Sequence, residues 1–406
     1  MPIIACCDLN STTSYNGALT YESNVSIIDL ASMMAGAKQG ARGGAWGSKE
    51  LERAGRGVLR FCVIGVGRAG LVHAANIQHR LKQAELVALC DPDAEGLARV
   101  GRQLTVERRY SDYHEALRDS EVEAVVIAAP AFAHREIASE AAAQGKHIFL
   151  EKPMALSVAE CAAINEAAAQ AGVTLQIGFM RRFDAAFMEA KELLDTGEMG
   201  RVMIIKSTGR GPGLPPEWIY DIGKSNGILA EVNSHDFDSL RWFVGAEIVR
   251  VHAEAANFKC DDVRESHPDF YDNAVVTLRF AGGTIGVIDG TCPAHYGYDA
   301  RVEILCERGV LFIGSVADRG VTQVTHEGKV TERAVHSWRS LFRDAYLAEI
   351  EHFIECVHEG STPRATGIDG LKAVEAVVAA NLSIQRGELM EIGAQARTAT
   401  WLEGER

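Results

Sequence analysis

Apolar residues recur between residues 58 and 180 as short, continuous runs of strand length. The runs are VLRFCVIG, AELVALCD, EAVVIAAP, KHIFLEKP and VTLQIGFM. Between them lie segments with the apolar spacing of helices, such as GLVHAANIQHRLK, HREIASEAAAQ and SVAECAAINEAAAQA. Continuous apolar strands that alternate with helices are typical of a parallel sheet covered on both faces. The pattern therefore predicts a doubly wound α/β domain of the Rossmann type over residues 58–180.

The pattern changes after residue 180. A helix (DAAFMEAKELLDTG), a strand (RVMIIKSTG) and a Pro- and Gly-rich loop (GPGLPPEWIYDIGKSNG) come first. The runs EIVRVHAEA, NAVVTLRF, GTIGVIDGT, RVEILC and GVLFIG then follow one another with short turns, as in successive hairpins. Two helical stretches, at about 342–358 and 369–386, close the domain. This order predicts a C-terminal α+β domain over residues 181–392 with a largely antiparallel sheet.

The two ends of the chain do not share these patterns. Residues 1–57 are rich in Ser, Thr, Asn, Gly and Ala, and GARGGAWGSKELERAGRG has the composition of a linker. We expect a flexible N-terminal extension there; a regulatory arm and a start codon assigned too early are the alternatives. Residues 393–406 are expected to form a C-terminal tail.

Composition narrows the class of partner. The 406 residues carry a net charge of -14, which argues against nucleic acid or an anionic membrane as partner and favours a small molecule. Nine cysteines without a C-x-x-C pair indicate free thiols in a reducing compartment. There is no apolar run of about 20 residues and no basic segment of a signal peptide, so we expect a cytoplasmic protein.

The hexapeptide GVGRAG follows the first predicted strand and opens a helix. In this position Gly65 permits a tight turn, Gly67 lets backbone approach a pyrophosphate, and Gly70 lets the helix pack on the strand. Together with the intervening Arg68 and Ala69, these residues are expected to bind the phosphates of a dinucleotide at the helix N-terminus.

Asp91 ends the second predicted strand, 25 residues after Val66 of the glycine loop. A carboxylate there can accept hydrogen bonds from the ribose hydroxyls of the adenosine and would repel a 2′-phosphate. The alternative for Asp91 is the N-cap of the helix that follows. NAD is therefore predicted as the cofactor in preference to NADP.

The segment EVNSHDFDSLRW, residues 231–242, has a helical pattern. In one continuous helix Glu231, His235 and Asp238 would lie on one face. Such a face fits a solvated surface, a catalytic site or a metal site equally well on its own, because histidine suits all three. No second His/Cys cluster with ligand spacing is visible, so we expect no metal.

Six segments taken together resemble a known family. They are GVGRAG, AAPAFAH, GKHIFLEKPMALS, GFMRRFD, SHDFDSLRW and YGYDARVE. They are similar to the glucose-fructose oxidoreductase / inositol dehydrogenase / MocA family, nearest its inositol 2-dehydrogenase branch, over residues 59–392. The resemblance implies an NAD(P)-dependent oxidoreductase acting on sugars or cyclitols. It also implies a C-terminal domain whose open sheet face mediates homo-oligomerisation, as a dimer or tetramer.

The resemblance also implies roles for individual residues. The family's EKP lysine falls on Lys152, which would touch both nicotinamide and substrate, and its general acid/base falls on His235. Relatives of the inositol dehydrogenase type carry Asp four residues before that histidine, where this chain has Glu231. This replacement leaves the local hydrogen bonding and the identity of the substrate open.

The chemistry of the side chains fits the same roles. Oxidation of a secondary alcohol needs a base with a pKa near the working pH, which His235 offers. Lys152 would stabilise the developing alkoxide, although a salt bridge with Glu151 is the alternative. Glu231, one turn before His235, could orient the imidazole.

Further contacts are expected on both ligands. Cofactor contacts are predicted for Pro130, Glu151 and Lys152 beside the glycine loop and Asp91. Substrate contacts are predicted for Arg181, Asp184, Asp236, Tyr296 and Tyr298, which follow the last Rossmann strand, lie on the histidine helix or belong to YGYDARVE. For the two tyrosines an interstrand turn that packs aromatic rings is the alternative, and Trp218 is a candidate pocket wall.

These features predict an NAD-dependent dehydrogenase of a cyclitol or sugar. A glycoside hydrolase that keeps NAD bound and oxidises its substrate transiently is the second hypothesis, because that chemistry also occurs on this family's fold. A cofactor-binding regulator without turnover is the third, and Lys152 and His235 argue against it.

Overall fold

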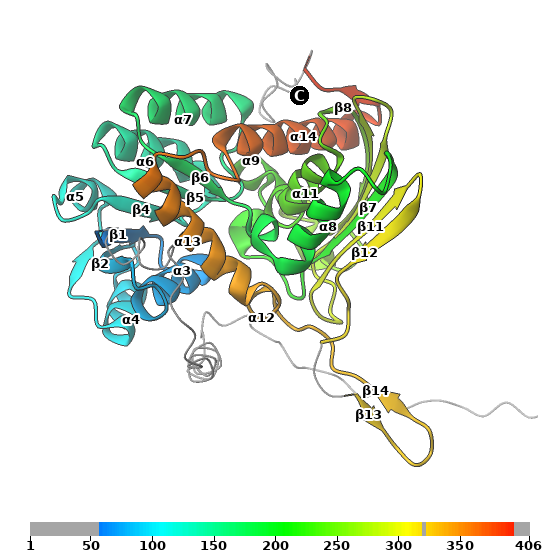
Figure 1. Ribbon diagram of the computed structural model, residues 1–406, viewed down its shortest axis with the longest axis horizontal. Coiled ribbons are helices and arrows are strands. Elements are labelled where there is room, and N and C mark those ends of the chain that lie inside the picture. Colours follow the sequence, from blue (N-terminus) through cyan, green and yellow to red (C-terminus); the bar gives the residue numbers. More distant parts are fainter. Residues whose placement is uncertain (1–56, 319–321, 394–406) are drawn as a thin grey trace, which may run out of the picture.

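The computed structural model describes residues 57–318 and 322–393 (Figure 1). The predictions about the N-terminal extension and the C-terminal tail therefore fall almost entirely outside the described residues. Within them, no helix has the length and apolar character that crossing a membrane requires.

The first sheet has six parallel strands in the order β3-β2-β1-β4-β5-β6. Its strands are β1 (Leu59–Ile64), β2 (Ala84–Cys90), β3 (Arg108–Tyr110), β4 (Ala124–Ile127), β5 (His147–Glu151) and β6 (Leu175–Gly178). This is the strand order of a Rossmann domain and confirms the predicted doubly wound fold. The pattern missed β3, because that edge strand is short and largely exposed and so lacks an apolar run.

Helices flank this sheet on both sides. They are α3 (Arg68–His79), α4 (Ala94–Leu104), α5 (Tyr113–Arg118), α6 (Ala131–Ala143) and α7 (Val158–Ala171). Local sequence fixes their ends: in α7 Ser157 and Glu160 form a reciprocal capping box, and Gly172 ends the helix at a φ of 65°.

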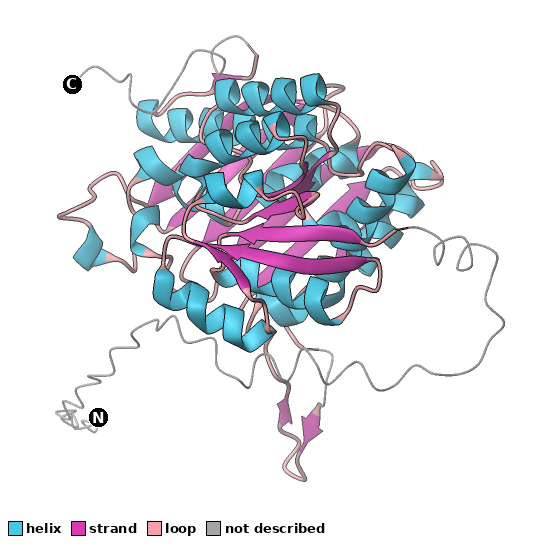
Figure 2. Cartoon of the chain, turned by 90° about the vertical axis from the view of Figure 1, so that its left-hand side faces the viewer, coloured by secondary structure: helices cyan, strands magenta, loops and turns pink. Residues whose placement is uncertain are grey.

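The second sheet has seven strands in the order β12-β11-β7-β10-β9-β8-β15. They are β7 (Val202–Arg210), β8 (Ile248–Ala256), β9 (Asn273–Phe280), β10 (Ile285–Thr291), β11 (Asp299–Cys306), β12 (Gly309–Ile313) and β15 (Met390–Glu391). Neighbouring strands are antiparallel except for the parallel pair β7 and β10, so the prediction of a largely antiparallel sheet is confirmed. A short hairpin, β13 (Gln323–Val324) and β14 (Val330–Thr331), projects from the body in both views (Figures 1 and 2).

The remaining elements lie between or after these strands. They are η2 (Met180–Phe183), α8 (Ala185–Asp195), η3 (Glu217–Ile219), α9 (Ile222–Ser225), α10 (Gly227–Glu231), α11 (Ser234–Val244), η4 (Asp261–Val263), α12 (Trp338–Leu341), α13 (Arg343–Glu359) and α14 (Gly367–Arg386). Helices α11 and α14 pack against strands of the second sheet.

Helix α13 returns to the first sheet although it lies late in the chain. It packs on α3 and β5, and the Phe353 ring lies 6.0 Å from the rings of both Phe61 and Phe149. Ile350, Phe353 and Ile354 are buried in the same apolar cluster as β1. The last third of the chain thus completes the core beneath the glycine loop.

Candidate active site

Two glycines of GVGRAG are required by packing. Gly65 has a φ of +90°, and a Cβ built there would lie 2.6 Å from the carbonyl oxygen of Ala128. A Cβ on Gly70 would lie 1.8 Å from the carbonyl oxygen of Gly65. Neither position can hold a side chain while helix α3 stays packed on β1 and β4.

Gly67 is different, because a Cβ built there meets nothing within 4 Å. It is the N-cap of α3, and no side chain caps that helix end. The backbone N–H groups of the first turn, from Arg68 and Ala69 onward, therefore face an open cradle with the positive end of the helix dipole behind it. This geometry fits the pyrophosphate of a dinucleotide.

Asp91 braces this loop. Its two carboxylate oxygens accept hydrogen bonds from the backbone N–H of Val66, at 2.8 Å, and of Asp93, at 2.9 Å. The N-cap of α4 is Asp93, so the alternative that Asp91 caps the helix is wrong. Asp91 remains partly exposed at the carboxyl end of β2, where a ribose hydroxyl would lie.

The other predicted cofactor residues end the next strands. Pro130 is exposed and is the N-cap of α6, just after β4. Glu151, at the end of β5, is buried, and its Oε1 lies 2.7 Å from Nε2 of His73. Glu151 therefore has an internal partner in addition to its place beside Lys152.

Lys152 reaches across the seam between the domains. Its Nζ donates to the backbone carbonyl of Glu231 at 2.7 Å and lies 3.6 Å from the Oε2 of the same residue. The guanidinium of Arg68 lies 3.6 Å from the other carboxylate oxygen of Glu231. Glu231 thus sits between two cations of the Rossmann domain, and Lys152 pairs with Glu231 rather than with Glu151.

The prediction of one continuous helix through residues 231–242 is wrong. Helix α10 ends at Glu231, Val232 and Asn233 form a turn, and α11 begins at Ser234. The turn forms because the Asn233 side chain leaves the helical path and donates to the backbone carbonyl of Gly209 at 3.1 Å. Glu231, His235 and Asp238 consequently do not share one face, and each has different neighbours.

The first turn of α11 rests directly on the second sheet at two glycines. Gly209 and Gly290 are register partners on β7 and β10. A Cβ on Gly209 would lie 2.0 Å from Asp236, and one on Gly290 would lie 2.3 Å from Asn233. The missing side chains let the backbone of α11 approach the sheet closely, which sets the position of the adjacent His235.

His235 is buried against aromatic and cationic neighbours. Its ring lies 6.1 Å from the Phe179 ring in an edge-on arrangement, and its Nδ1 is buried without a hydrogen-bond partner among the described residues. Burial, followed by the positive charges of Lys152 and Arg181, holds the pKa of His235 well below its usual value. The imidazole is therefore neutral at neutral pH and able to accept a proton.

Arg181 and Asp236 form a buried ion pair. Arg181 donates to Asp236 at 2.6 Å, and the two side chains are 1% and 0% exposed. Ser207 donates to the same carboxylate at 2.5 Å. Tyr298 lies beside Arg181; burial raises the pKa of its phenol and Arg181 opposes that rise.

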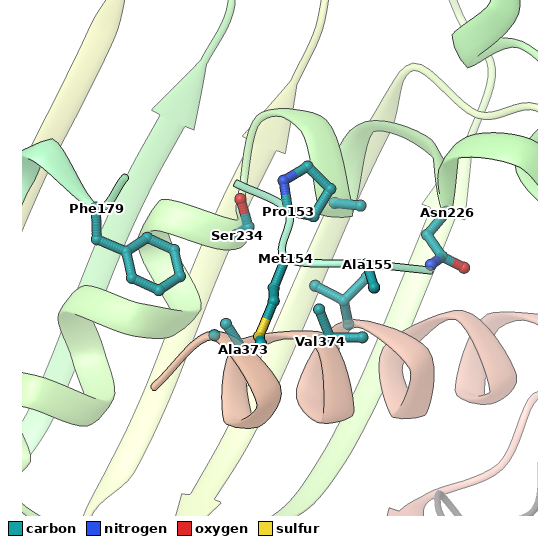
Figure 3. Close-up of a pocket in the computed structure, with 11 residues that line it drawn as sticks. Pro153, Met154, Ala155, Phe179, Asn226, Ser234, Ala373 and Val374 are labelled. Atoms are coloured by element: carbon teal, nitrogen blue, oxygen red, sulfur yellow. The ribbon is translucent and has the colours of Figure 1, made fainter. Parts of the chain in front are cut away.

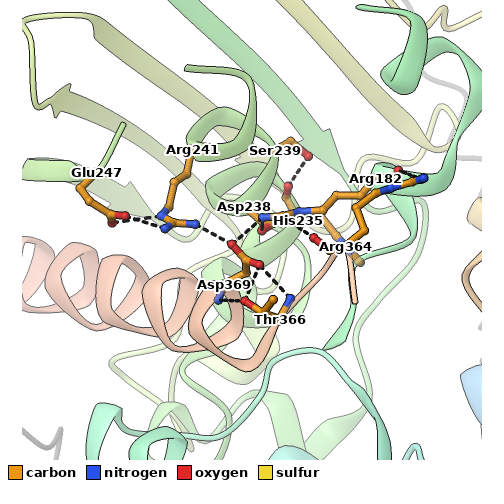
Figure 4. Close-up of polar contacts among 9 residues, drawn as sticks. All are labelled: Arg182, His235, Asp238, Ser239, Arg241, Glu247, Arg364, Thr366 and Asp369. Atoms are coloured by element: carbon orange, nitrogen blue, oxygen red, sulfur yellow. Dashed lines mark hydrogen bonds and ion pairs between the residues drawn. The ribbon is translucent and has the colours of Figure 1, made fainter. Parts of the chain in front are cut away.

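A second ion-pair network lies on another side of α11 (Figure 4). Arg182 donates to Asp238 at 2.9 and 2.6 Å and lies 2.9 Å from Asp369 of α14, which Arg241 also contacts at 2.7 Å. Asp238 thus fastens α11 to η2 and α14. Because its carboxylate is engaged there, it cannot share a metal ion with Glu231 and His235.

Two of the predicted substrate residues, Asp184 and Tyr296, have hydrogen-bond partners within the protein. Asp184 caps helix α8 by accepting from the backbone N–H of Ala186 and Phe187. Tyr296 donates to Asp299 at 2.6 Å and accepts from Arg210 at 3.2 Å. Because Gly209 faces α11 and successive strand residues alternate, Arg210 and its partner Tyr296 lie on the opposite face of the sheet from Asp236. The structure does not bring Tyr296 together with His235.

A small cavity lies between Pro153 and Met154 of the EKP segment and helix α14 (Figure 3). It is lined by Pro153, Met154, Ala155, Phe179, Asn226, Ala230, Ser234, Gly370, Ala373, Val374 and Val377. This lining is mostly apolar and does not suit a polyol, which needs converging hydrogen-bonding groups.

Sequence reasoning missed Asn233 and Ser207, which support Asp236 and hence α11. It also missed the side chain of Arg68 as a partner for Glu231. The two glycines at the same end of RVMIIKSTG and GTIGVIDGT were a usable signal, because glycine within a strand often marks close approach of another backbone. The ion pairs gave no such signal, since they join residues that are distant in sequence.

Comparison with known proteins gives consistent results. Residues 59–179 match the family model for the oxidoreductase family with an NAD-binding Rossmann fold, and residues 187–312 match the GFO/IDH/MocA C-terminal domain. The chain is 35% identical to a scyllo-inositol 2-dehydrogenase (NAD(+)) of Bacillus subtilis, over 81% of this chain and 95% of that one. It is 34% identical to a myo-inositol 2-dehydrogenase of Thermotoga maritima, over 80% and 96%.

Solved structures agree with these matches. A scyllo-inositol dehydrogenase of Lactobacillus casei with bound NAD(H) and scyllo-inositol superposes with a TM-score of 0.77 at 26% identity, covering 82% of this chain and 99% of that one. A probable dehydrogenase from Thermotoga maritima also has a TM-score of 0.77, at 34% identity, over 82% and 98%. With its glycine loop, its two sheets and these relatives, the chain belongs to the glucose-fructose oxidoreductase / inositol dehydrogenase / MocA family of NAD-dependent oxidoreductases.

Proposed function

We propose that this protein oxidises a ring hydroxyl of an inositol-type cyclitol, with His235 as general acid/base and Lys152 as its electrostatic partner. The observation that carries the proposal is the pairing of a buried, neutral imidazole with a lysine close enough to lower its pKa. Lys152 directly follows β5 at the carboxyl end of the Rossmann sheet, where doubly wound folds bind their ligands.

The chain's own residues account for the proton and for the charge of the transition state. The backbone of Gly67, Arg68 and Ala69 together with Asp91 would hold NAD, which would supply the hydride acceptor. Neutral His235 takes the proton of the reacting hydroxyl. The ammonium of Lys152, kept in place by Glu231, stabilises the negative charge that develops on the substrate oxygen.

A buried polar atom of the proposed acid/base supports a polyol as substrate. His235 Nδ1 is buried without a hydrogen-bond partner in the described part of the chain. Buried polar groups are normally paired, so the hydroxyls of a ring polyol or the water that it displaces are the natural partners. The inositol dehydrogenases among the relatives support a cyclitol over an open-chain alcohol.

Glu231 is proposed to act on Lys152 rather than directly on His235. Its carboxylate lies between Lys152 and Arg68, each at 3.6 Å, so it balances the lysine charge and holds the ammonium at the seam. We propose that the longer side chain, relative to the Asp of the inositol dehydrogenase type, shifts the preference among hydroxyl positions of the ring.

A panel of inositols and aldoses tested with NAD distinguishes this function from the alternative. Formation of NADH with an inositol supports the proposal. The alternative, a glycoside hydrolase that oxidises its substrate transiently, would release the aglycone of a nitrophenyl glycoside without net NADH. Release of aglycone together with inertness toward every inositol would replace the proposal by that alternative.

We also propose that the protein is a homo-oligomer that assembles through the open face of the second sheet. Exposed apolar side chains on that face include Val275, 50% exposed, and Phe312, 73% exposed. A monomer at micromolar concentration in light scattering would contradict this.

Buried free thiols support a reducing, cytoplasmic location. They are Cys62, Cys90, Cys161, Cys260, Cys292, Cys306 and Cys356.

A further inference from the structure

Three polar side chains are packed together in the core beside the main chain of Lys152. His73 of α3, Glu151 of β5 and Glu349 of α13 are 0%, 4% and 0% exposed. One nitrogen or oxygen of each lies within 4.8 Å of those of the other two. The proposed transfer of hydride and proton uses none of the three, and yet two carboxyl groups in a protein core need an explanation.

Glu151 is fully engaged. Its Oε1 is bonded to Nε2 of His73 at 2.7 Å, and its Oε2 accepts the backbone N–H of Lys152 at 3.1 Å. Helix α3 begins at the phosphate loop, and Lys152 carries the proposed catalytic ammonium. One buried carboxylate therefore joins the cofactor-binding helix to the main chain of the catalytic lysine.

Glu349 is not engaged in this way. Both of its carboxyl oxygens are buried without a hydrogen-bond partner in the described ranges. An ionised carboxylate in such a place is costly, and a second carboxylate nearby increases the cost. Burial, followed by the charge of Glu151, raises the pKa of Glu349 well above its usual value.

The groups around Glu349 come from four elements. They are His73 on α3, Glu151 on β5, Gln176 on β6, whose amide donates to the backbone carbonyl of Glu349 at 2.8 Å, and Tyr346 one turn earlier on α13. No Lys or Arg is among them. Burial, followed by the charge of Glu151, raises the pKa of the Tyr346 phenol, so that group is neutral as well.

We propose that Glu349 is a positioning residue that carries a proton at neutral pH, and that this proton keeps Glu151 in place against Lys152. With Glu349 neutral, the core contains a single carboxylate, which His73 and the Lys152 N–H share. Ionisation of Glu349 would place two carboxylates side by side at low dielectric. Glu151 would then be driven from His73 or from Lys152, and the phosphate loop and the catalytic lysine would lose their common support.

The proposal has a thermodynamic consequence that does not depend on the substrate. A carboxyl group whose folded-state pKa is raised stabilises the fold below its unfolded pKa, and that contribution is lost as pH rises toward the folded value. Unfolding at neutral pH then releases one proton from Glu349. The unfolding constant of the wild type should therefore contain a factor that grows about tenfold per pH unit.

Urea unfolding at several pH values between about 6 and 8 tests this directly. Glu349→Gln has the shape of the protonated side chain and no proton to release. The variant should be more stable than the wild type. The ratio of the wild-type unfolding constant to that of the variant should grow about tenfold per pH unit. The control is Glu351→Gln, at an exposed position two residues away on α13. Its stability should depend on pH in the same way as that of the wild type. Parallel curves for Glu349→Gln and the wild type would overturn the proposal.

A measurement on the wild type covers the case in which Glu349→Gln fails to fold. Infrared spectra in D2O at mildly alkaline pH should show a carboxylic-acid C=O band in the folded protein that disappears in urea, and its absence would overturn the proposal. A stoichiometric divalent metal ion in the purified protein would also overturn it, because a cation would then occupy the place of the proton.

One further readout rests on the proposed function. If the protein is an inositol dehydrogenase, Glu349→Gln should keep its kcat at neutral pH and retain it at alkaline pH, where the wild type declines. Absence of any inositol activity in the wild type would refute the proposed function and leave the unfolding test intact. A wild type and variant with identical alkaline limbs would contradict the role of Glu349 in supporting Lys152.

Discussion

Gly209 and Asp236 lie so close that a Cβ built on the glycine would be 2.0 Å from the Asp236 carboxylate. Asp236 belongs to the first turn of α11 and directly follows His235, so this contact fixes how deeply the helix seats on the sheet. The position of the proposed acid/base thus depends on a residue without a side chain on a strand distant in sequence.

Gly209→Ala should push the first turn of α11 away from the sheet. A displacement of about 1 Å at a catalytic group can lower the rate on the order of a hundredfold, and overpacking costs typically about 1–3 kcal/mol of stability. We expect a large fall in kcat for inositol oxidation, a lower Tm and little change in NAD affinity. Thr208→Ala, on the other face of the same strand, is the matched control. A Gly209→Ala enzyme with normal kcat would show that His235 is not positioned by this contact.

Asp91 should determine the choice between NAD and NADP. Asp91→Ala removes the carboxylate that would repel a 2′-phosphate and also the brace on Val66 N. The ratio of kcat/KM for NAD over NADP should therefore fall, with some loss of stability. Asp93→Ala removes only the N-cap of α4, at a cost of about 1 kcal/mol, and should leave the ratio unchanged. An Asp91→Ala ratio equal to that of the wild type would remove Asp91 from the recognition of the ribose.

Most of the fold could be predicted because it depends on local patterns. The runs that became β1, β2, β4, β5 and β6 are continuous and apolar, and the glycine spacing of GVGRAG can be recognised without tertiary information. The short strand β3 could not be found in this way, since its residues are mostly exposed.

The site was only partly predictable, because its geometry is set by contacts between distant residues. Helical spacing placed Glu231 and His235 on one face, whereas the Asn233 side chain bonds the backbone of β7 and interrupts the helix. Tyr296 and Tyr298 precede β11, and Gly297 between them has a φ of +137°. Tyr296 bonds Asp299 whereas Tyr298 lies beside Arg181, and the order YGYD alone does not reveal this. The cluster of Glu349 with His73 and Glu151 could not be predicted, since helix periodicity does not show which residues share a core.

Glu231→Gln should make the environment of His235 more positive. The Glu231 carboxylate lies 3.6 Å from Lys152, and a less balanced lysine charge disfavours the imidazolium further. The acid limb of the kcat profile should move to lower pH, and kcat should fall as Lys152 loses its anchor. Glu217→Gln, at an exposed position in the Pro-rich loop, is the control.

Glu231→Asp tests whether the length of the Glu231 side chain matters. The shorter side chain should change the ranking of inositols and sugars more than it changes NAD binding. If both Glu231 variants match the wild type on every substrate, Glu231 has no part in catalysis.

Lys152→Met should shift the acid limb of the kcat profile to higher pH. Removing the ammonium raises the pKa of His235 toward its usual value, so activity should be lost at a higher pH on acidification. Loss of one group that stabilises an oxyanion typically lowers kcat about a hundred- to a thousandfold. Lys224→Met, which removes a surface lysine paired with Asp221, is the control. If the acid limb of Lys152→Met lies at the same pH as that of the wild type, Lys152 does not act on His235.

The most direct test of the central claim is the pH dependence of kcat for inositol oxidation in the wild type and in His235→Ala. The wild type should keep its activity below pH 6.5, because the pKa of His235 is lowered, and then lose it along a single acid limb. His235→Ala should have a kcat lower by about a hundred- to ten-thousandfold, without that limb and with NAD affinity nearly unchanged. A His235→Ala enzyme with wild-type kcat and the same acid limb would contradict the assignment of His235 as the acid/base.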